Sequence, residues 1–203
     1  MIRKGRKMQI IIFNQKGGVG KSMLATQIAL YFDATILELD PYGVLSQTLG
    51  EDFVYKVGLN EHLPEVVDGD VVYDFGGFDD KRVDTAAKNA DLIIIPFNPT
   101  INSLGTTLES YRRVVKLGVP ILFVINAVIK EQDALDAMEY LKETLQESDL
   151  DFFTLPHTRA LQTSENEGQS IISLAKSSGL RRHTYRKISA TMQELMHHIK
   201  SYI

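Results

Sequence analysis

The chain has 203 residues, of which 44% are hydrophobic and 24% are charged, and this balance is ordinary for a globular domain with a core of its own. The lack of cysteine excludes disulfides and thiolate-bound metal clusters, and no apolar run approaches the roughly 18 residues of a membrane-spanning helix. A net charge of −4 argues against indiscriminate binding of nucleic acid by the whole surface. We therefore predict one cytoplasmic domain over residues 1–203, with residues 1–7 as a basic and flexible N-terminus.

Stretches rich in β-forming residues alternate along the chain with stretches of helical periodicity. Strands are expected at 8–14, 35–39, 70–77, 91–96, 120–126 and 152–156. Helices are expected at 20–32, 81–89, 102–117, 132–147 and from about residue 181 onward. Residues 44–69 have little periodicity, and we expect a short helix and loop there. This alternation predicts an α/β fold, a mainly parallel sheet with helices on both faces.

The turn between the first strand and the first helix carries the sequence N-Q-K-G-G-V-G-K-S at residues 14–22. Its glycines allow the backbone to bend sharply and to direct N–H groups at phosphate oxygens, and the following helix adds its positive dipole end. In such a loop Lys21 reaches the β- and γ-phosphates of a nucleotide, and Ser22 holds a magnesium ion. A strand, a glycine-rich turn and G-K-S in this order indicate a phosphate-binding loop, so we predict ATP and Mg²⁺ as cofactors.

Two carboxylates follow predicted strands. Asp74 ends an apolar run at residues 71–73, which is the pattern of a Walker B strand, and Asp40 ends the second strand. Ligands of parallel α/β sheets bind at the carboxyl ends of the strands, so both acids are expected beside the phosphate-binding loop. The alternative for either acid is a role as a helix cap or a turn residue.

The motif K-G-G-V-G-K-S at residues 16–22 resembles the deviant Walker A motif of the ParA/MinD superfamily of P-loop ATPases, in particular small ParA-type partition ATPases without an N-terminal helix-turn-helix. Lys16 stands in the place of the family's signature lysine. The sequence E-L-D-P, ending at Pro41, resembles the family's first switch, D-x-D-P, in which Asp40 matches the acid that orients the attacking water. The resemblance runs from residue 9 to about residue 170 and implies hydrolysis of ATP to ADP and phosphate, with Lys16, Lys21 and Asp40 as catalytic residues.

The resemblance also implies which residues form the nucleotide and magnesium sites. The nucleotide-binding residues would be Gln15, Lys16, Gly17, Gly18, Val19, Gly20, Lys21, Ser22, Met23, Asn126 and Pro156. The magnesium ligands would be Ser22, Asp40 and Asp74. Two features depart from the family pattern. Met23 stands where the family has a hydroxyl residue, which would remove one contact to the phosphates. The span from Lys21 to Asp40 is short, so either the first helix is trimmed or the turn at 32–34 is tight.

In the family, the lysine that Lys16 resembles reaches across a two-fold interface to the nucleotide of the partner. The resemblance thus implies a sandwich homodimer with ATP and a monomer with ADP, because loss of the γ-phosphate removes the charge that holds the two faces together. A centromere-binding or adaptor protein would stimulate slow hydrolysis, as in plasmid or chromosome partition.

The C-terminal end of the chain is basic, since residues 176–203 contain six Lys or Arg and one acid, Glu194. We interpret its central charges as a surface for non-specific DNA, which would make the dimer nucleoid-associated. The residues of this surface would be Arg181, Arg182, Arg186 and Lys187. The alternative is a solvated helix face without a ligand.

Two other classes of function stay open. A MinD-like ATPase that positions cargo or lies on a membrane would use the amphipathic, basic C-terminal helix as an interfacial anchor. However, its six apolar residues in strict register, spread over 185–202, more often indicate packing on the core. A small-molecule P-loop kinase or synthetase would share the loop, but the sequence has no distinct insertion for a second substrate.

Overall fold

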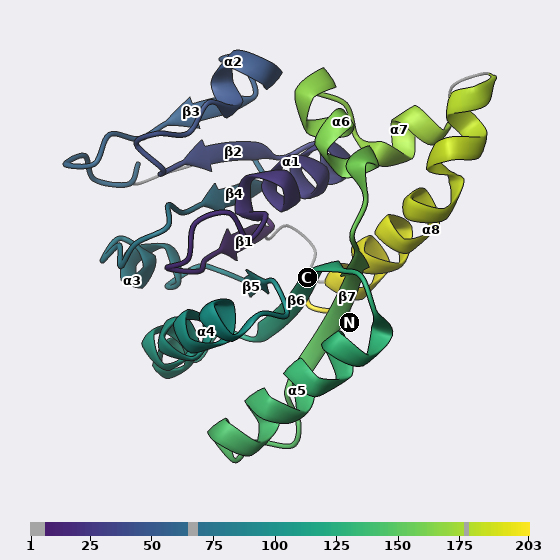
Figure 1. Cartoon of the computed structure of the whole chain (residues 1–203). Helices are drawn as coiled ribbons and strands as arrows, with labels where there is room; N and C mark the ends of the chain where they lie inside the picture. Colours follow the sequence, from purple (N-terminus) through teal and green to yellow (C-terminus); the bar gives the residue numbers. More distant parts are fainter. Residues whose placement is uncertain (1–6, 65–68, 177–178) are drawn as a thin grey trace.

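The computed structural model describes residues 7–64, 69–176 and 179–203, with the side chains of Leu180 and Arg181 excepted. Residues 1–6, most of the expected flexible N-terminus, lie outside this part of the chain. Within it, seven strands form a single sheet in the order β3-β2-β4-β1-β5-β6-β7, and every neighbouring pair is parallel (Figure 1). The strands are β1 (Gln9–Ile12), β2 (Thr35–Glu38), β3 (Val54–Lys56), β4 (Val71–Asp74), β5 (Leu92–Phe97), β6 (Ile121–Val128) and β7 (Asp151–Pro156). The predicted parallel sheet is therefore confirmed.

Helices cover both faces of the sheet, as the alternation of elements predicts (Figure 1). One face is covered by α1 (Lys21–Phe32), α6 (Arg159–Glu167), α7 (Ile171–Lys176) and α8 (Leu180–Lys200). The other face is covered by α3 (Val83–Ala86), α4 (Ile101–Val114) and α5 (Glu131–Leu145). The short helix α2 (Leu45–Leu49) leads into the edge strand β3, and a 3₁₀ turn (η1, Val115–Leu117) follows α4.

Alternate side chains of the central strand enter two separate apolar clusters. Ile10 and Ile12 belong to the cluster that α1 and α8 complete, whereas Ile11 and Phe13 belong to the cluster that α4 and α5 complete. All four side chains are fully buried. A strand covered on both faces requires a continuous apolar run, which explains the sequence pattern before the glycine-rich loop.

The short span between Lys21 and Asp40 is accommodated by a tight turn. Helix α1 still runs for 12 residues, and Asp33 caps it in the left-handed region at φ 57°. The N–H of Ala34 then donates to the carbonyl of Ala29 at 3.0 Å, and β2 begins at the next residue. Of the two alternatives raised by the sequence, the structure therefore adopts the tight turn.

Four elements were missed or overextended by the sequence pattern. Strand β3 is only three residues long and lies at the sheet edge with two of its side chains exposed, so it has no alternation to detect. Helices α6 and α7 lie in a region without a predicted helix. The helix predicted at 81–89 is confined to α3, because most of that segment forms turns.

The apolar stripe of α8 packs on the domain, as its register predicts. Met192, Leu195 and Ile199 are fully buried in the cluster shared with α1. At the end of the helix, His198 Nε2 lies 2.6 Å from Asp151 Oδ2 of β7, and the Tyr202 hydroxyl donates to the same oxygen. Across the residues that the structure describes, no helix combines the length and the apolar character of a bilayer span.

Candidate functional site

The acids singled out in the sequence meet at one edge of the sheet. Strand β4 lies between β1 and β2, with Asp74 paired in register with Ile12 on one side and Glu38 on the other. The glycine-rich loop leaves the same end of β1, and Asp40 follows β2 there. Because carboxyl ends of parallel strands converge, this edge is where an α/β sheet binds ligands.

The loop between β1 and α1 has the backbone of an anion cradle. Gly18 and Gly20 have φ values of 74° and 95°, and a Cβ on Gly20 would lie 2.2 Å from the amide nitrogen of Asn126. No described side chain caps the start of α1, so the N–H groups of its first turn remain available to an anion. On the other side, a Cβ on Gly77, in the loop after β4, would lie 3.0 Å from the backbone nitrogen of Gly17.

The two lysines of the loop have different surroundings. Lys21 is 7% exposed, and its amine donates to the carbonyl of Lys16 at 2.8 Å, inside the curve of the loop. Burial lowers the pKa of Lys21, while the charges of Asp74 and Asp40 oppose that shift. Lys16, in the same loop, is exposed to solvent. One lysine therefore lies where a bound phosphate would sit, and the other is free to reach beyond the chain's own loop.

A buried amide fixes the start of the loop, a feature that the sequence motif did not reveal. Asn14 donates to the carbonyl of Pro96 at 2.8 Å and to Thr107 of α4 at 3.1 Å, and its oxygen accepts from the N–H of Lys16 at 2.9 Å. Ser110 of α4 accepts from the next residue, Gln15, at 3.0 Å. The sequence held one hint of this contact. Hydroxyl residues at positions 103, 107 and 110 are spaced so that they lie on one face of a helix, where they can accept or donate hydrogen bonds to a neighbouring polar group.

Asp74 is a buried carboxylate without an ordinary partner. It is 1% exposed, and within the described part of the chain no hydrogen bond of normal geometry reaches either of its oxygens. Burial raises its pKa to about 7, although the nearby hydroxyl of Ser22 and the charge of Lys21 act in the opposite direction. An orphaned buried carboxylate beside a hydroxyl fits a magnesium ion, which prefers oxygen ligands. The residues present therefore suit the predicted ion.

The two acids of the E-L-D-P segment differ in burial and in their hydrogen-bond partners. Asp40 is half-exposed, accepts from the N–H of Tyr42 at 3.0 Å, and lies close enough to affect the pKa of Lys21 and Asp74. Glu38 is fully buried, and its Oε1 accepts from the N–H of Leu45 at 2.8 Å. One oxygen of Glu38 is thus used at the start of α2, while its Oε2 has no hydrogen-bond partner among the described residues and lies 3.9 Å from Lys56 Nζ. The charges of both Glu38 and Asp40 raise the pKa of Asp74.

Three predicted nucleotide-binding residues differ in how they contact the glycine-rich loop. Asn126 touches the loop, because its amide donates to the carbonyl of Val19 at 3.0 Å. The side chain of Met23 is buried in the core cluster, and its Cε lies 3.5 Å from the position of an added Cβ on Gly20, so it packs beneath the loop. Pro156 lies on the outer strand β7, paired with Val128, where it lines a hollow of 430 Å³. Binding of adenine by Asn126 and Pro156 stays a prediction.

The predicted DNA-binding residues lie on the N-terminal half of α8, which runs beside α7 (Figure 1). Arg182, Arg186 and Lys187 are exposed, and both arginines line a hollow of 270 Å³ together with Lys176. The side chain of Arg181 lies outside the described residues. Helix α1, which begins at the loop site, contacts α6, and α6 contacts α8, so packed helices connect this basic surface to the site.

Comparison with known proteins gives one family and a set of similar folds. Residues 10–171 match the CobQ/CobB/MinD/ParA nucleotide binding domain. No curated protein sequence matches the chain closely enough to count as a relative.

Several solved structures have a similar fold at low sequence identity. An ATP complex of a McdA variant from Cyanothece has a TM-score of 0.65 at 15% identity, covering 96% of this chain and 97% of that one. A ParA family ATPase from Chlorobium tepidum has a TM-score of 0.64 at 16% identity, covering 96% and 99%. MinD in the MinC:MinD cell division complex of Aquifex aeolicus has a TM-score of 0.61 at 17% identity, covering 93% and 95%.

Proposed function

The chain belongs to the CobQ/CobB/MinD/ParA family of nucleotide-binding domains, and we propose that it is a ParA-like, magnesium-dependent ATPase, with residues 1–203 as one domain. In this cycle ATP drives formation of a sandwich homodimer, and the dimer binds DNA without sequence preference. Slow hydrolysis, stimulated by a centromere-binding or adaptor protein, returns the monomer. Such a cycle segregates plasmids or chromosomes.

The contrast between the two lysines of the loop carries this proposal. The amine of Lys21 donates to the carbonyl of Lys16. The phosphates of the chain's own nucleotide would take over this amine as a hydrogen-bond donor. Lys16 is exposed to solvent, and its backbone is held by Asn14. A lysine exposed in this way is free to reach the phosphates of a second copy. Release of γ-phosphate would remove the charge that pairs with it.

The remaining polar groups of the site have distinct roles in hydrolysis. Ser22, Asp74 and Asp40 would hold the magnesium ion, which neutralises charge on the β- and γ-phosphates when bound. Lys21 would stabilise the charge that develops on the transferred phosphoryl group. Asp40 is half-exposed and lies near Asp74 and Lys21, and it would orient the attacking water.

The DNA-binding part of the proposal depends on the basic half of α8. Arg182, Arg186 and Lys187 are exposed on one short segment, and a two-fold dimer would present them twice. Each phosphate that they neutralise releases counterions, so affinity for DNA should fall steeply with salt. Paired substitution of Arg182 and Arg186 by alanine is expected to abolish ATP-dependent retention of a random duplex in gel shifts. Unchanged retention would leave α8 without this role.

The decisive test is the mass of the particle in solution. With ATP, light scattering should give a dimer for the wild-type chain and a monomer for Lys16→Ala, and with ADP both should be monomers. Lys88→Ala, which removes another exposed lysine, is the matched control and should dimerise normally. Dimerisation of Lys16→Ala with ATP to the wild-type extent would refute the proposed dimer.

A MinD-like role on membranes is the second candidate, because MinD is among the proteins of similar fold. The apolar stripe of α8 argues against it, since Met192, Leu195 and Ile199 are buried in the core and would have to unpack to enter lipid. Sedimentation with anionic liposomes in the presence of ATP separates the two candidates. We expect the protein to stay in the supernatant.

A further inference from the structure

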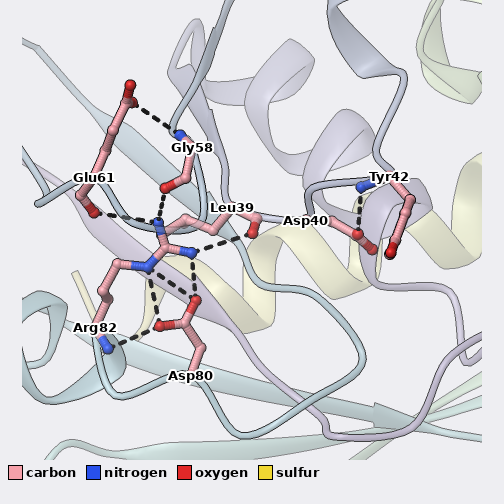
Figure 2. A network of polar contacts seen from close by, with 7 residues as sticks. All are labelled: Leu39, Asp40, Tyr42, Gly58, Glu61, Asp80 and Arg82. Carbon is pink, nitrogen blue, oxygen red and sulfur yellow. Dashed lines mark hydrogen bonds and ion pairs between the residues drawn. The ribbon is translucent and has the colours of Figure 1, made fainter.

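The loop after β4 contains a buried ion pair that the nucleotide motifs do not explain (Figure 2). The side chains of Asp80 and Arg82 are 5% and 12% exposed. Arg82 Nη2 lies 2.6 Å from Asp80 Oδ2, and its Nε lies 3.0 Å from both carboxylate oxygens. The N–H of Arg82 also donates to Asp80 at 2.9 Å. One carboxylate therefore fixes both the backbone and the guanidinium plane of the arginine.

The rest of the guanidinium joins two other loops at the same edge of the sheet. Arg82 Nη1 donates to the carbonyl of Gly58 at 2.7 Å and more weakly to that of Glu61 at 3.4 Å, both in the loop after β3. Arg82 Nη2 donates equally weakly, at 3.4 Å, to the carbonyl of Leu39, the residue that follows β2. Figure 2 shows these donors pointing from a single side chain to two segments that are distant from it in the sequence, while the nearby Asp80 holds another edge of the guanidinium.

The contact with Leu39 matters because the next residue is Asp40. The segment after it is a small turn, in which Asp40 accepts from the N–H of Tyr42 through its side chain and from the N–H of Gly43 through its carbonyl. Two described side chains from other elements hold this segment: Arg82 donates to the carbonyl of Leu39, at its start, and Lys56 of β3 donates to the carbonyl of Gly43 at 2.7 Å. Of these two, Arg82 holds the peptide that joins Leu39 to Asp40.

We propose that Arg82 is the positioning residue for Asp40, holding the segment after β2 against the loops after β3 and β4 so that its carboxylate faces the nucleotide. This inference rests on the proposed ATPase function and adds a residue to it. Arg82 does not act as a cation on phosphate, since Asp80 covers one edge of the guanidinium and backbone carbonyls take the remaining donors. Its planar fork suits this task, and a lysine cannot reproduce it.

The first test separates hydrolysis from binding. In Arg82→Lys and Arg82→Ala, kcat should fall on the order of 100-fold, since a displacement near 1 Å has such an effect. Affinity for a fluorescent ATP analogue without magnesium should stay within about twofold, because Asp40 acts on the water and not on the phosphates. Lys81→Ala, at the exposed neighbouring position, is the control and should keep wild-type kcat. An unchanged kcat in both Arg82 variants would overturn the proposal.

The second test asks whether Arg82 acts through Asp40. In an Asp40→Ala background, Arg82→Ala should produce no further loss of kcat, because the group that it positions is already missing. A further loss as large as in the wild-type background would show that Arg82 acts elsewhere, and would overturn the proposal.

A third test does not need hydrolysis. Amide hydrogen exchange in Arg82→Ala should quicken at residues 41–44 and 58–61 and stay unchanged in β1. If the wild-type chain neither binds nor hydrolyses ATP, the proposed function is wrong, while unchanged exchange at 41–44 is what overturns the role of Arg82. Should Arg82→Ala fail to fold, Asp80→Ala/Arg82→Ala, which leaves no unpaired charge, replaces it in all three tests.

Discussion

Two loops at the carboxyl edge of the sheet are held in opposite ways. The loop over residues 14–20 is anchored from within, since the fully buried Asn14 ties it to β5 and α4. The loop over residues 40–44 is held from outside, by Arg82 through the carbonyl of Leu39 just before it and by Lys56 through the carbonyl of Gly43, and Tyr42 and Val44 in it are 90% and 54% exposed. A rigid cradle thus lies beside a segment with few buried contacts. Segments of the second kind are the ones that move when a ligand changes.

The largest effect that would sharpen this contrast is expected at Gly20. Alanine there has to adopt φ 95° and collides with the amide of Asn126, so we expect a loss of about 2–5 kcal/mol in unfolding free energy, from backbone strain and overpacking together. Gly118 is the matched control, because it also lies in the left-handed region, at φ 72°, but has nothing within 4 Å of an added Cβ. Gly118→Ala should cost only about 1–2 kcal/mol. Urea denaturation measures both, and equal losses would mean that the cradle is not tightly packed.

The second effect concerns ligand-induced stability of the cradle. For the wild-type chain, saturation with ATP and magnesium at 100 times Kd should add about 2.7 kcal/mol to the unfolding free energy. Asp74→Asn should lose the part of this gain that depends on magnesium while keeping the part given by ATP with a chelator, because the orphaned carboxylate is the proposed ligand. Thermal melts with and without chelator measure the difference. An identical magnesium response in the variant would remove Asp74 from the site.

The third effect tests the internal anchor. Asn14→Ala leaves the N–H of Lys16 and the carbonyl of Pro96 without their buried partner, so we expect a loss of about 2 kcal/mol in unfolding free energy and weaker binding of a fluorescent ATP analogue. Glu109→Ala, on the exposed side of α4, controls for changes in that helix and should be neutral in both measurements. Normal nucleotide binding by Asn14→Ala would show that the cradle keeps its shape without this amide.

The smallest effect on stability is expected in the exposed loop over residues 40–44. Tyr42→Ala should change the unfolding free energy by less than about 0.5 kcal/mol, because the ring is almost fully exposed. A loss well above that value, measured by the same urea titration, would place Tyr42 in a packed environment and would break the contrast between the two loops.

Much of the fold and part of the site followed from local patterns in the sequence. The run before the glycine-rich loop predicted a strand buried on both faces, and the spacing of apolar residues predicted that α8 packs on the core. The order of strand, glycine turn and G-K-S located the cradle, because its geometry is made by consecutive residues. Asp74 followed from the apolar strand that it ends.

The contacts that hold the two loops could be learned only from the tertiary structure, because they join residues far apart in the chain. Asn14 pairs with α4 across 93 positions, and Arg82 reaches Leu39 across 43, so no local period marks either contact. Glu38 looked like part of the catalytic segment, yet the fold buries it under α2. Backbone carbonyls accept regardless of side-chain identity, so the partners of a buried arginine leave no trace in the sequence. Local chemistry therefore determined where a phosphate would bind, and packing determined which groups hold the two loops around it.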